Sequence, residues 1–384
     1  MNIHTDATTI ARSSRIFATT EEIIDEFRNG RMVVIVDAED RENEGDLLIP
    51  AQMATPQAVN FMAKHGRGLI CLALTHARAT ELQLDFMVRR NASRNRTAFT
   101  QSIEAREGIS TGISASDRAR TIAVAIDPTK EASDIVSPGH VFPLIARDGG
   151  VLVRAGHTEA SVDLARLAGL LPAAVICEVM NDDGRMARVP DLIAFAQTHE
   201  LKIGTIEDLI AYRLRHDQLI GQVAETTIAS AYGGEFEMRV YSAATDPVEH
   251  VALIKGDLSS PGPVPVRVHA VNAMSDLIGI GGTPGEEPAI AKAMQAIARA
   301  GRGVVILIRD PRPKALTEWI GQRARLGQSG GATREARQIE IGIGSQILRH
   351  LGVSDMILLT TSSTNTYVGL EAFGLRITKT CLIE

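Results

Sequence analysis

An acidic segment, Asp37 to Asp46, follows directly after a run of β-branched residues and is the first candidate for chemistry in the sequence. It reads DAEDRENEGD, so carboxylates that include Glu42 and Asp46 lie close together around Arg41. Clustered carboxylates repel one another unless they share a proton or a cation, and one or two of them could hold a divalent ion. Charge alone favours an ordinary solvated loop. The position after a buried strand, where active sites of α/β layers gather, favours a functional site.

A second candidate lies at the start of a helix that we expect to run to Ala168. It consists of Arg154, Ala155, Gly156, His157 and Thr158. The first turn of a helix offers free backbone N–H groups and the positive end of the helix dipole, and both attract phosphate. Arg154 adds positive charge, His157 is a candidate metal ligand, and Thr158 is expected to cap the helix. An ordinary Thr cap beside a surface histidine is an equally good interpretation of these residues alone.

Three weaker candidates complete the set. His140 follows a Pro-Gly turn and precedes an apolar strand, where a structural histidine is the more ordinary interpretation. Glu178 is a lone acid in the expected buried strand 173–180, and such acids frequently have raised pKa values and proton-transfer roles. Ser110 and Thr111 offer hydroxyl groups to phosphate oxygens, although a plain polar turn would have the same residues.

Together these groups suit one kind of chemistry. They supply a metal-binding carboxylate, an imidazole, a phosphate site and two separate acid–base groups. Such a set suits a small phosphorylated and hydroxylated substrate that reacts through an enediol.

The elements that must position these residues alternate along the chain. Apolar runs predict buried strands, and Thr or Pro starts with Gly stops predict helices between them. The strands expected first are 32–36, 69–74 and 173–180. The helices are expected at 20–29, 55–66, 158–168, from 190 and at 206–215, and residues 121–126 fit either a strand or a helix start. The polar segment 89–117 is too long for a plain connection and is expected to carry function.

A length of 384 residues suits two domains, and the stretch 216–222 is the best boundary between them. Beyond it, alternating strands are followed by further helices and strands. These are expected at 226–229, 235–241, 251–255, 288–300, 304–308, 335–351 and 356–360. The sequence therefore predicts an α/β fold of mixed α+β layers, with a first domain at 1–215 and a second α/β domain at 216–384.

Composition excludes several classes of protein. A net charge of −6 argues against a protein that binds nucleic acid through its backbone. The three cysteines are far apart in the sequence, so neither a disulfide framework nor a cysteine-built zinc site is expected. No segment approaches the roughly 18 apolar residues of a membrane span, and the N-terminal residues lack the apolar core of a signal peptide. We expect a soluble cytoplasmic protein without a membrane partner.

The first half of the chain resembles the 3,4-dihydroxy-2-butanone 4-phosphate synthase family. The resemblance runs in order over residues 15–210, and its motifs are long enough to be specific. They are RENEGD at 41–46, TGISASDR at 111–118, PGHVFPL at 138–144, GGVLVRAGHTEASVDLARLAG at 149–169 and CEVM at 177–180. The resemblance implies conversion of D-ribulose 5-phosphate to 3,4-dihydroxy-2-butanone 4-phosphate and formate, which supplies the four-carbon unit of riboflavin.

Roles follow from the resemblance position by position. It implies a divalent magnesium ion bound by Glu42 and His157, and manganese would suit the imidazole ligand as well. It implies that His140 and Glu178 are catalytic, as proton carriers, and that the enzyme is a homodimer with sites near the subunit interface. Our candidate substrate-binding residues are Arg41, Glu42, Asp46, Ser110, Thr111, Arg154, Ala155, Gly156, His157, Thr158 and Glu178.

The second half resembles the GTP cyclohydrolase II fold but departs from it where the chemistry should be. The resemblance is clearest at 266–271, 341–353 and 358–375. The family's three zinc-binding cysteines correspond to Asn272 and to positions near Thr283 and Gly285. The motif EGRGIGL reads DPRPKAL at 310–316, and the acid and arginine of a further motif read Arg337 and Ile339.

A zinc site of three protein ligands and one open position cannot be assembled from these residues. We therefore expect a synthase joined to a structural or regulatory cyclohydrolase-like domain without zinc. The alternative is a bifunctional enzyme that also hydrolyses GTP to a pyrimidine product and formate.

Overall fold

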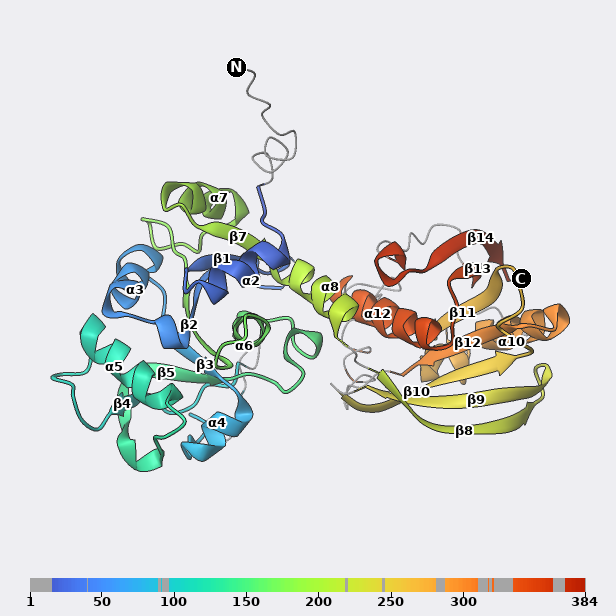
Figure 1. Cartoon of the computed structure of the whole chain (residues 1–384), viewed down its shortest axis with the longest axis horizontal. Helices are drawn as coiled ribbons and strands as arrows, with labels where there is room; N and C mark the ends of the chain where they lie inside the picture. The colour runs from blue at the N-terminus through green and yellow to red at the C-terminus, as the bar shows by residue number, and fades with distance from the viewer. Residues whose placement is uncertain are drawn as a thin grey trace, which may run out of the picture. The chain divides into compact units, whose positions relative to one another are not determined.

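The computed structural model divides into two compact units, Met1–Tyr212 and Arg213–Glu384 (Figure 1). The division falls within helix α8 (Ile206–His216), near the boundary expected at 215/216. The structure describes residues 16–39, 41–88, 91, 97–217, 220–243, 246–280, 287–309, 317, 320, 334–361 and 370–383. In this part of the chain, no helix is both long enough and apolar enough to cross a bilayer.

Seven described strands form one mixed sheet in the first unit, in the order β4-β5-β3-β6-β2-β1-β7. The pairs β1–β7 and β3–β5 are parallel, and the other neighbours are antiparallel. The bounds are β1 (Val33–Val36), β2 (Gly45–Pro50), β3 (Cys71–Leu74), β4 (Ile103–Ala105), β5 (Ile135–Ile145), β6 (Ala173–Glu178) and β7 (Lys202–Thr205).

Helices cover both faces of this sheet. Residues of α3, α5 and α7 share one large core with alternate strand residues such as Val34 and Leu72. On the opposite face α6 packs against β2, β3 and β6 and against α2, with Val162 beside Ala73. The helix bounds are α2 (Thr20–Arg28), α3 (Pro56–Phe61, continued as a π-helical turn to Gly66), α4 (His76–Glu81), α5 (Ala115–Ile126), α6 (His157–Leu167) and α7 (Val189–Thr198). Cover on both faces explains why the strands are continuously apolar.

Three expectations need correction. Residues 121–126 belong to the longer helix α5, which begins at Ala115 inside the segment expected to be irregular. The residues around His140 form no turn; they continue strand β5. Thr158 does not cap α6, because the extended residue Gly156 is the N-cap and the helix already begins at His157.

The second unit has its own seven-stranded sheet among the described residues, in the order β14-β13-β11-β12-β10-β9-β8. Its first half is an antiparallel meander, and β11 pairs in parallel with β12 and β13. The strands are β8 (Ile220–Ser230), β9 (Gly234–Ala243), β10 (Asp246–Lys255), β11 (Val264–Ala270), β12 (Gly303–Ile308), β13 (Asp355–Thr360) and β14 (Arg376–Leu382). The helices are α9 (Ala273–Asp276), α10 (Ala289–Ala300) and α12 (Arg334–His350). The sequence missed β2, β4, β7, β11 and β14 as strands.

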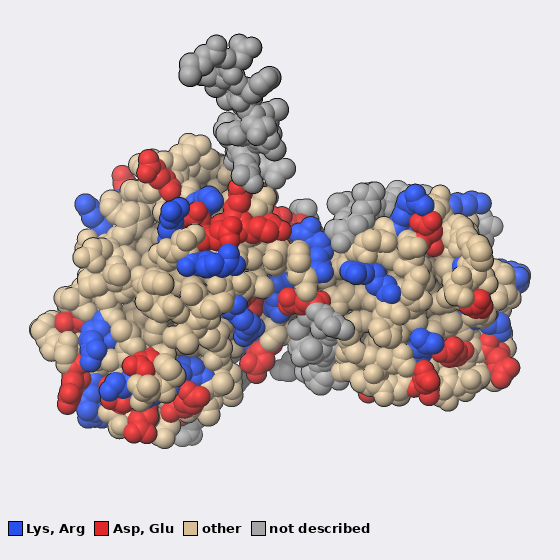
Figure 2. Space-filling model, viewed as in Figure 1, with Lys and Arg blue, Asp and Glu red and all other residues tan. Residues whose placement is uncertain are grey.

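Charged side chains are interspersed over each unit. On the face drawn in Figure 2, acidic and basic residues of the described chain are mixed over both units, apart from one gathering of acidic side chains on the first unit. The candidate residues are therefore distinguished by their burial and their geometry.

Candidate active site

One cluster of side chains lies where strand β1 ends and strand β2 begins, and it contains His157, Glu42 and Asp46. The register places Asp46 beside Ile35 on β1 and beside Glu178 on β6, so these three side chains lie on the α6 side of the sheet. His157, the first residue of α6, places Nδ1 3.7 Å from Glu42 Oε2 and 3.7 Å from Asp46 Oδ1. Segments more than one hundred residues apart therefore converge on one imidazole.

The orientation of this imidazole is fixed by its other nitrogen. Nε2 of His157 lies 3.1 Å from the backbone carbonyl of Ile35. A carbonyl only accepts hydrogen bonds, so Nε2 carries a proton and donates it to that carbonyl. This contact aims Nδ1 at the two carboxylates, which is how histidines that bind metals are commonly held.

The acidic loop between β1 and β2 has a definite shape. Asp37, buried at the end of β1, accepts hydrogen bonds from the backbone N–H of Glu42 at 3.0 Å and of Glu44 at 2.8 Å. Arg41 Nη1 lies 2.8 Å from Asp37 Oδ2 and 2.6 Å from Glu42 Oε2. The loop is therefore folded around its own carboxylates, which excludes the solvated-loop interpretation.

The residues present fit a divalent cation. Within the described residues, Asp37, Glu42 and His157 form the one group whose ligand atoms all lie within 4.8 Å of one another. Oδ1 of Asp46 is buried without a hydrogen-bond partner and is aimed at the same place. Carboxylate oxygens are the ligands that magnesium and manganese prefer. Asp37 was part of the acidic segment but was not identified as a ligand; its position directly after the strand was the available signal.

Burial and neighbouring charges act on these groups in opposite directions. Burial, helped by Glu178 and Glu42, raises the pKa of Asp46 to about 7 against the effect of His157. Burial would also raise the pKa of Glu42, but His157 and Arg41 outweigh it and lower the pKa to about 2. Burial disfavours a charged His157, yet Asp46 and Glu42 raise its pKa to about 9. A metal ion bound at Nδ1 would have to displace that proton.

The start of α6 gathers positive charge. Arg154 lies 2.6 Å from the buried Glu159 and 3.1 Å from the hydroxyl of Thr97. A Cβ at Gly156 would lie 2.4 Å from Arg154 Nη1 and 3.0 Å from Arg41 Nη2, so both guanidinium groups come close to the helix start. The N–H of Gly156 donates to the carbonyl of Arg154 at 2.8 Å, so the N–H groups left for a phosphate are those of the first turn of α6, which includes Thr158.

Glu159 was quoted within a motif but missed as a site residue. It is 1% exposed, and besides Arg154 it accepts a hydrogen bond from the backbone N–H of Arg147 at 3.0 Å. Its carboxylate therefore ties the start of α6 to the loop before it.

Glu178 lies next to the cluster. It ends β6 opposite Asp46, and its Oε2 accepts a hydrogen bond from the backbone N–H of Leu69 at 2.8 Å. A side chain at Gly68 would lie 2.5 Å from the same oxygen, so glycine is required for this approach. The half-buried carboxylate of Glu178 is thus paired with the backbone N–H group of Leu69.

His140 and the loop at Ser110 and Thr111 form a separate group. His140 lies on β5, three interstrand spacings from β2 in the sheet, or roughly 14 Å. Its Nδ1 pairs with Oε1 of Glu104 on β4. The N–H and hydroxyl of Ser110 both donate to Asp117, while Thr111 is exposed. Within one chain, the structure does not bring these residues to the Glu42–His157 cluster.

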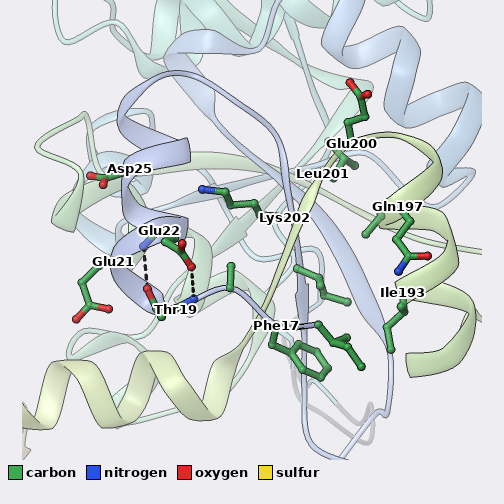
Figure 3. A pocket seen from close by; sticks show the side chains of 14 residues that line it. Phe17, Thr19, Glu21, Glu22, Asp25, Ile193, Gln197, Glu200, Leu201 and Lys202 are labelled. Carbon is green, nitrogen blue, oxygen red and sulfur yellow. Dashed lines mark hydrogen bonds between the residues drawn. The ribbon is translucent and has the colours of Figure 1, made fainter. Parts of the chain in front are cut away.

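A cavity of about 780 Å³ lies elsewhere in the first unit, between α2, α7 and β7 (Figure 3). Glu22 lines this cavity, and its carboxylate forms the N-terminal capping box of α2 with Thr19. None of the candidate site residues lines this cavity, so its size does not indicate the site of chemistry.

In the second unit, the described position that corresponds to a zinc-binding cysteine of the GTP cyclohydrolase II family is Asn272. Asn272 caps α9 and accepts a hydrogen bond from the N–H of Met274 at 3.0 Å. Cys71 and Cys177 are buried in the first unit. The positions near 283 and 285, and residues 310–316, lie outside the described residues, and Arg337 and Ile339 lie in α12. Near Asn272, His269 Nε2 lies 2.9 Å from Asp276 Oδ2.

Comparison with known proteins agrees with both units. The family model for 3,4-dihydroxy-2-butanone 4-phosphate synthase matches residues 21–212, and that for GTP cyclohydrolase II matches 221–381. A 3,4-dihydroxy-2-butanone 4-phosphate synthase of Photobacterium phosphoreum is 45% identical, covering 94% of this chain and 98% of that one. The riboflavin biosynthesis protein RibBA of Aquifex aeolicus (strain VF5) is 48% identical, covering 94% and 91%.

Two solved structures extend the comparison. RibBX, a two-domain 3,4-dihydroxy-2-butanone 4-phosphate synthase from A. baumannii, is 40% identical with a TM-score of 0.80, covering 96% of this chain and 99% of that one. A 3,4-dihydroxy-2-butanone 4-phosphate synthase in complex with two magnesium ions is 43% identical with a TM-score of 0.50, covering 52% and 99%.

Two joined α/β domains, with acid–base groups gathered at the edge of the first sheet, define a two-domain enzyme. The matches to the family models and to the relatives identify the family within this class. The chain belongs to the 3,4-dihydroxy-2-butanone 4-phosphate synthase family and carries a second domain like GTP cyclohydrolase II. The expected fold and resemblance are confirmed.

The contacts of Glu159 predict a large effect on stability. Glu159→Ala removes the carboxylate that the half-buried Arg154 faces at 2.6 Å. Breaking a buried ion pair by removing one partner destabilises by about 3–5 kcal/mol. The change in the free energy of unfolding is measured by urea unfolding, monitored through hydrogen exchange of peptides from α6 and β6. The exposed pair Arg185–Asp183 provides the control, and Arg185→Ala should leave the midpoint unchanged. Equal midpoints for both variants would contradict this role of Glu159.

Proposed function

We propose that the first domain converts D-ribulose 5-phosphate to 3,4-dihydroxy-2-butanone 4-phosphate and formate, as a lyase of riboflavin biosynthesis. The observation that carries this proposal is the meeting of Glu42 and Asp46 at His157 Nδ1, each at 3.7 Å, with no hydrogen bond to Asp46 Oδ1. The membership of the chain in the synthase family supports it. The direct test is an assay of ribulose 5-phosphate and GTP side by side, with and without added magnesium and zinc.

Glu42 and His157 would hold the magnesium or manganese ion, with Asp37 within reach of the same place. A bound divalent ion polarises a ketose carbonyl and a neighbouring hydroxyl, and so acidifies the C–H bond between them. The related synthase that was solved in complex with two magnesium ions supports this choice of metal.

The chain's own groups would bind the phosphate and move protons. Arg154, Arg41 and the first turn of α6 would bind the phosphate, since both guanidinium groups come close to Gly156 at the helix start. Burial raises the pKa of Asp46 to about 7 in the metal-free chain, which favours a role in proton transfer beside the ion. Glu178 and His140 supply the other acid–base groups for enolisation, loss of water, carbon migration and release of formate.

A homodimer would place the two groups of residues at one site. His140 is roughly 14 Å from the strand of Asp46, which is long for a single pentulose phosphate to span. Phe86, Met87 and Val88, in the segment that bridges to Thr100 beside β5, are 46–56% exposed. Consecutive exposed apolar residues favour a protein interface. We place the enzyme in the cytoplasm, with small-molecule partners and neither nucleic acid nor membrane.

The second domain would be structural or regulatory and would bind no zinc. Asn272 is used as a helix cap, the buried thiols of Cys71 and Cys177 lie in the other unit, and Cys381 on β14 is the single cysteine of the second unit. The alternative of a bifunctional enzyme rests on relatives named RibBA, whereas a relative in Arabidopsis thaliana is named monofunctional.

Removal of a metal ligand provides the first functional test. Glu42→Ala or His157→Ala should lower metal-dependent formate release from ribulose 5-phosphate by at least about 100-fold, because the ion loses one of its two main ligands. The control is Glu39→Gln, which removes a charge from an exposed residue of the same loop and should leave turnover unchanged. Turnover like that of the unmodified enzyme in either alanine variant, with the fold intact, would refute the assignment.

Incubation with GTP tests the second domain. With GTP and zinc added, the protein should release neither formate nor a pyrimidine product, because Cys381 is the single cysteine of the second unit and the family's zinc site takes three. Ribulose 5-phosphate with magnesium serves as the positive control on the same sample. Turnover of GTP at an ordinary enzymatic rate would establish the bifunctional alternative.

Truncation after residue 216 tests the structural role. We expect the shorter chain to melt at a lower temperature and to dimerise more weakly than the full chain. Light scattering, a thermal melt and the ribulose 5-phosphate assay measure these properties. A truncated protein with full activity, solubility and oligomeric state would remove the support for this role.

A further inference from the structure

Glu104 and His140 form a pair that lies apart from the Glu42–His157 cluster. Glu104 is the middle residue of β4, and its side chain is 15% exposed, while that of His140 on β5 is 44% exposed. Oε1 of Glu104 contacts Nδ1 of His140. The ring thus has one nitrogen against a carboxylate, while nearly half of the side chain is open to solvent.

The backbone of Gly112 packs directly against the contact between Glu104 and His140. A Cβ at Gly112, which has φ +88°, would collide with the Glu104 carboxylate and would lie 2.7 Å from His140 Nδ1. The loop that carries Ser110 and Thr111 therefore covers the contact closely. Asp117 holds this loop, since it accepts a hydrogen bond from the N–H of Gly112 at 3.0 Å and from the hydroxyl of Ser110 at 2.8 Å.

Other contacts hold the strand that carries the histidine. The backbone N–H of Gly139 donates to Ser102 Oγ at 3.1 Å, and the hydroxyl of Ser137 donates to the carbonyl of Ser102 at 2.5 Å. Ladder pairs between β4 and β5 add to these. The backbone of β5 is therefore held without the Glu104 side chain. The contact of the Glu104 carboxylate acts on the orientation of the His140 imidazole.

We propose that Glu104 is a positioning residue for His140 in the synthase reaction. An ionised carboxylate only accepts hydrogen bonds, so it keeps the proton of the neutral imidazole on Nδ1. Nε2 is then the nitrogen with the free lone pair, on the ring that the solvent reaches. A base whose second nitrogen is held in this way is the recurring arrangement of acid–base sites.

The proton step follows from this tautomer, and it rests on the function proposed above. Nε2 takes a proton from the substrate carbon, and the electron pair of the broken C–H bond remains on the substrate as the enediolate. The imidazolium formed lies against the Glu104 carboxylate, which stabilises its charge. The same proton returns from Nε2 at a later step, so the ring is regenerated.

The test compares Glu104→Ala with His140→Ala and with the double variant in the full chain. Glu104→Ala should lower kcat by about 10- to 100-fold with KM nearly unchanged, the size found for residues that orient a functional histidine. In the His140→Ala background the same change should have no further effect. Glu107→Gln, an exposed acid three residues away, is the control and should leave kcat unchanged.

A second measurement does not depend on activity. Nitrogen-15 NMR of labelled histidine, with the His140 signal assigned by its loss in His140→Ala, should show the Nδ1–H tautomer in the unmodified protein. Glu104→Gln keeps the shape of the side chain, and its amide can turn either its oxygen or its NH₂ to the ring. That variant should show mixed tautomers with an unchanged melting temperature, so it covers the case in which Glu104→Ala fails to fold.

Two results would overturn the proposal. One is an unchanged His140 tautomer in Glu104→Gln, and the other is a loss of rate on Glu104→Ala that is as large without His140 as with it. Absence of ribulose 5-phosphate turnover in the unmodified protein would refute the proposed function instead, because the tautomer measurement would still report on Glu104.

Discussion

The rest of the site depends on the two contacts of one buried imidazole. The carbonyl of Ile35 fixes Nε2 of His157, and this leaves Nδ1 between the carboxylates of Glu42 and Asp46. Both contacts require that β1, β2 and the start of α6 keep their register to within a fraction of an ångström. The continuous apolar strands and the helices packed on both faces provide that rigidity, because close-packed interiors resist small displacements.

Charge balance explains why so many acids and bases can be buried together here. Arg41 pairs with both Asp37 and Glu42 within the loop, His157 faces Glu42 and Asp46, and Glu159 neutralises Arg154 at the helix start. Asp46 is the exception, since its Oδ1 has no hydrogen-bond partner. A buried oxygen without a partner is costly in a folded protein unless a ligand or an ion uses it. The site is therefore best understood as built for a cation and an anionic substrate.

The sequence predicted strands β1, β3 and β6 and the acidic loop after β1, because these depend on local apolar and charged patterns. It misplaced the start of α6, since Thr158 looked like a cap whereas the extended residue Gly156 is the N-cap and the helix begins at His157. It also missed Glu104, whose role depends on a partner in another strand. The separation of His140 from His157 could not be predicted either, because it follows from the strand order of the sheet.

The central claim is that a divalent cation binds between Glu42 and Nδ1 of His157. Anomalous diffraction from crystals of the full chain grown with manganese tests it most directly. The account predicts an anomalous peak at bonding distance from both side chains, and loss of that peak in His157→Ala crystals. A peak only elsewhere, with the Glu42–His157 pair intact and free of metal, would contradict it.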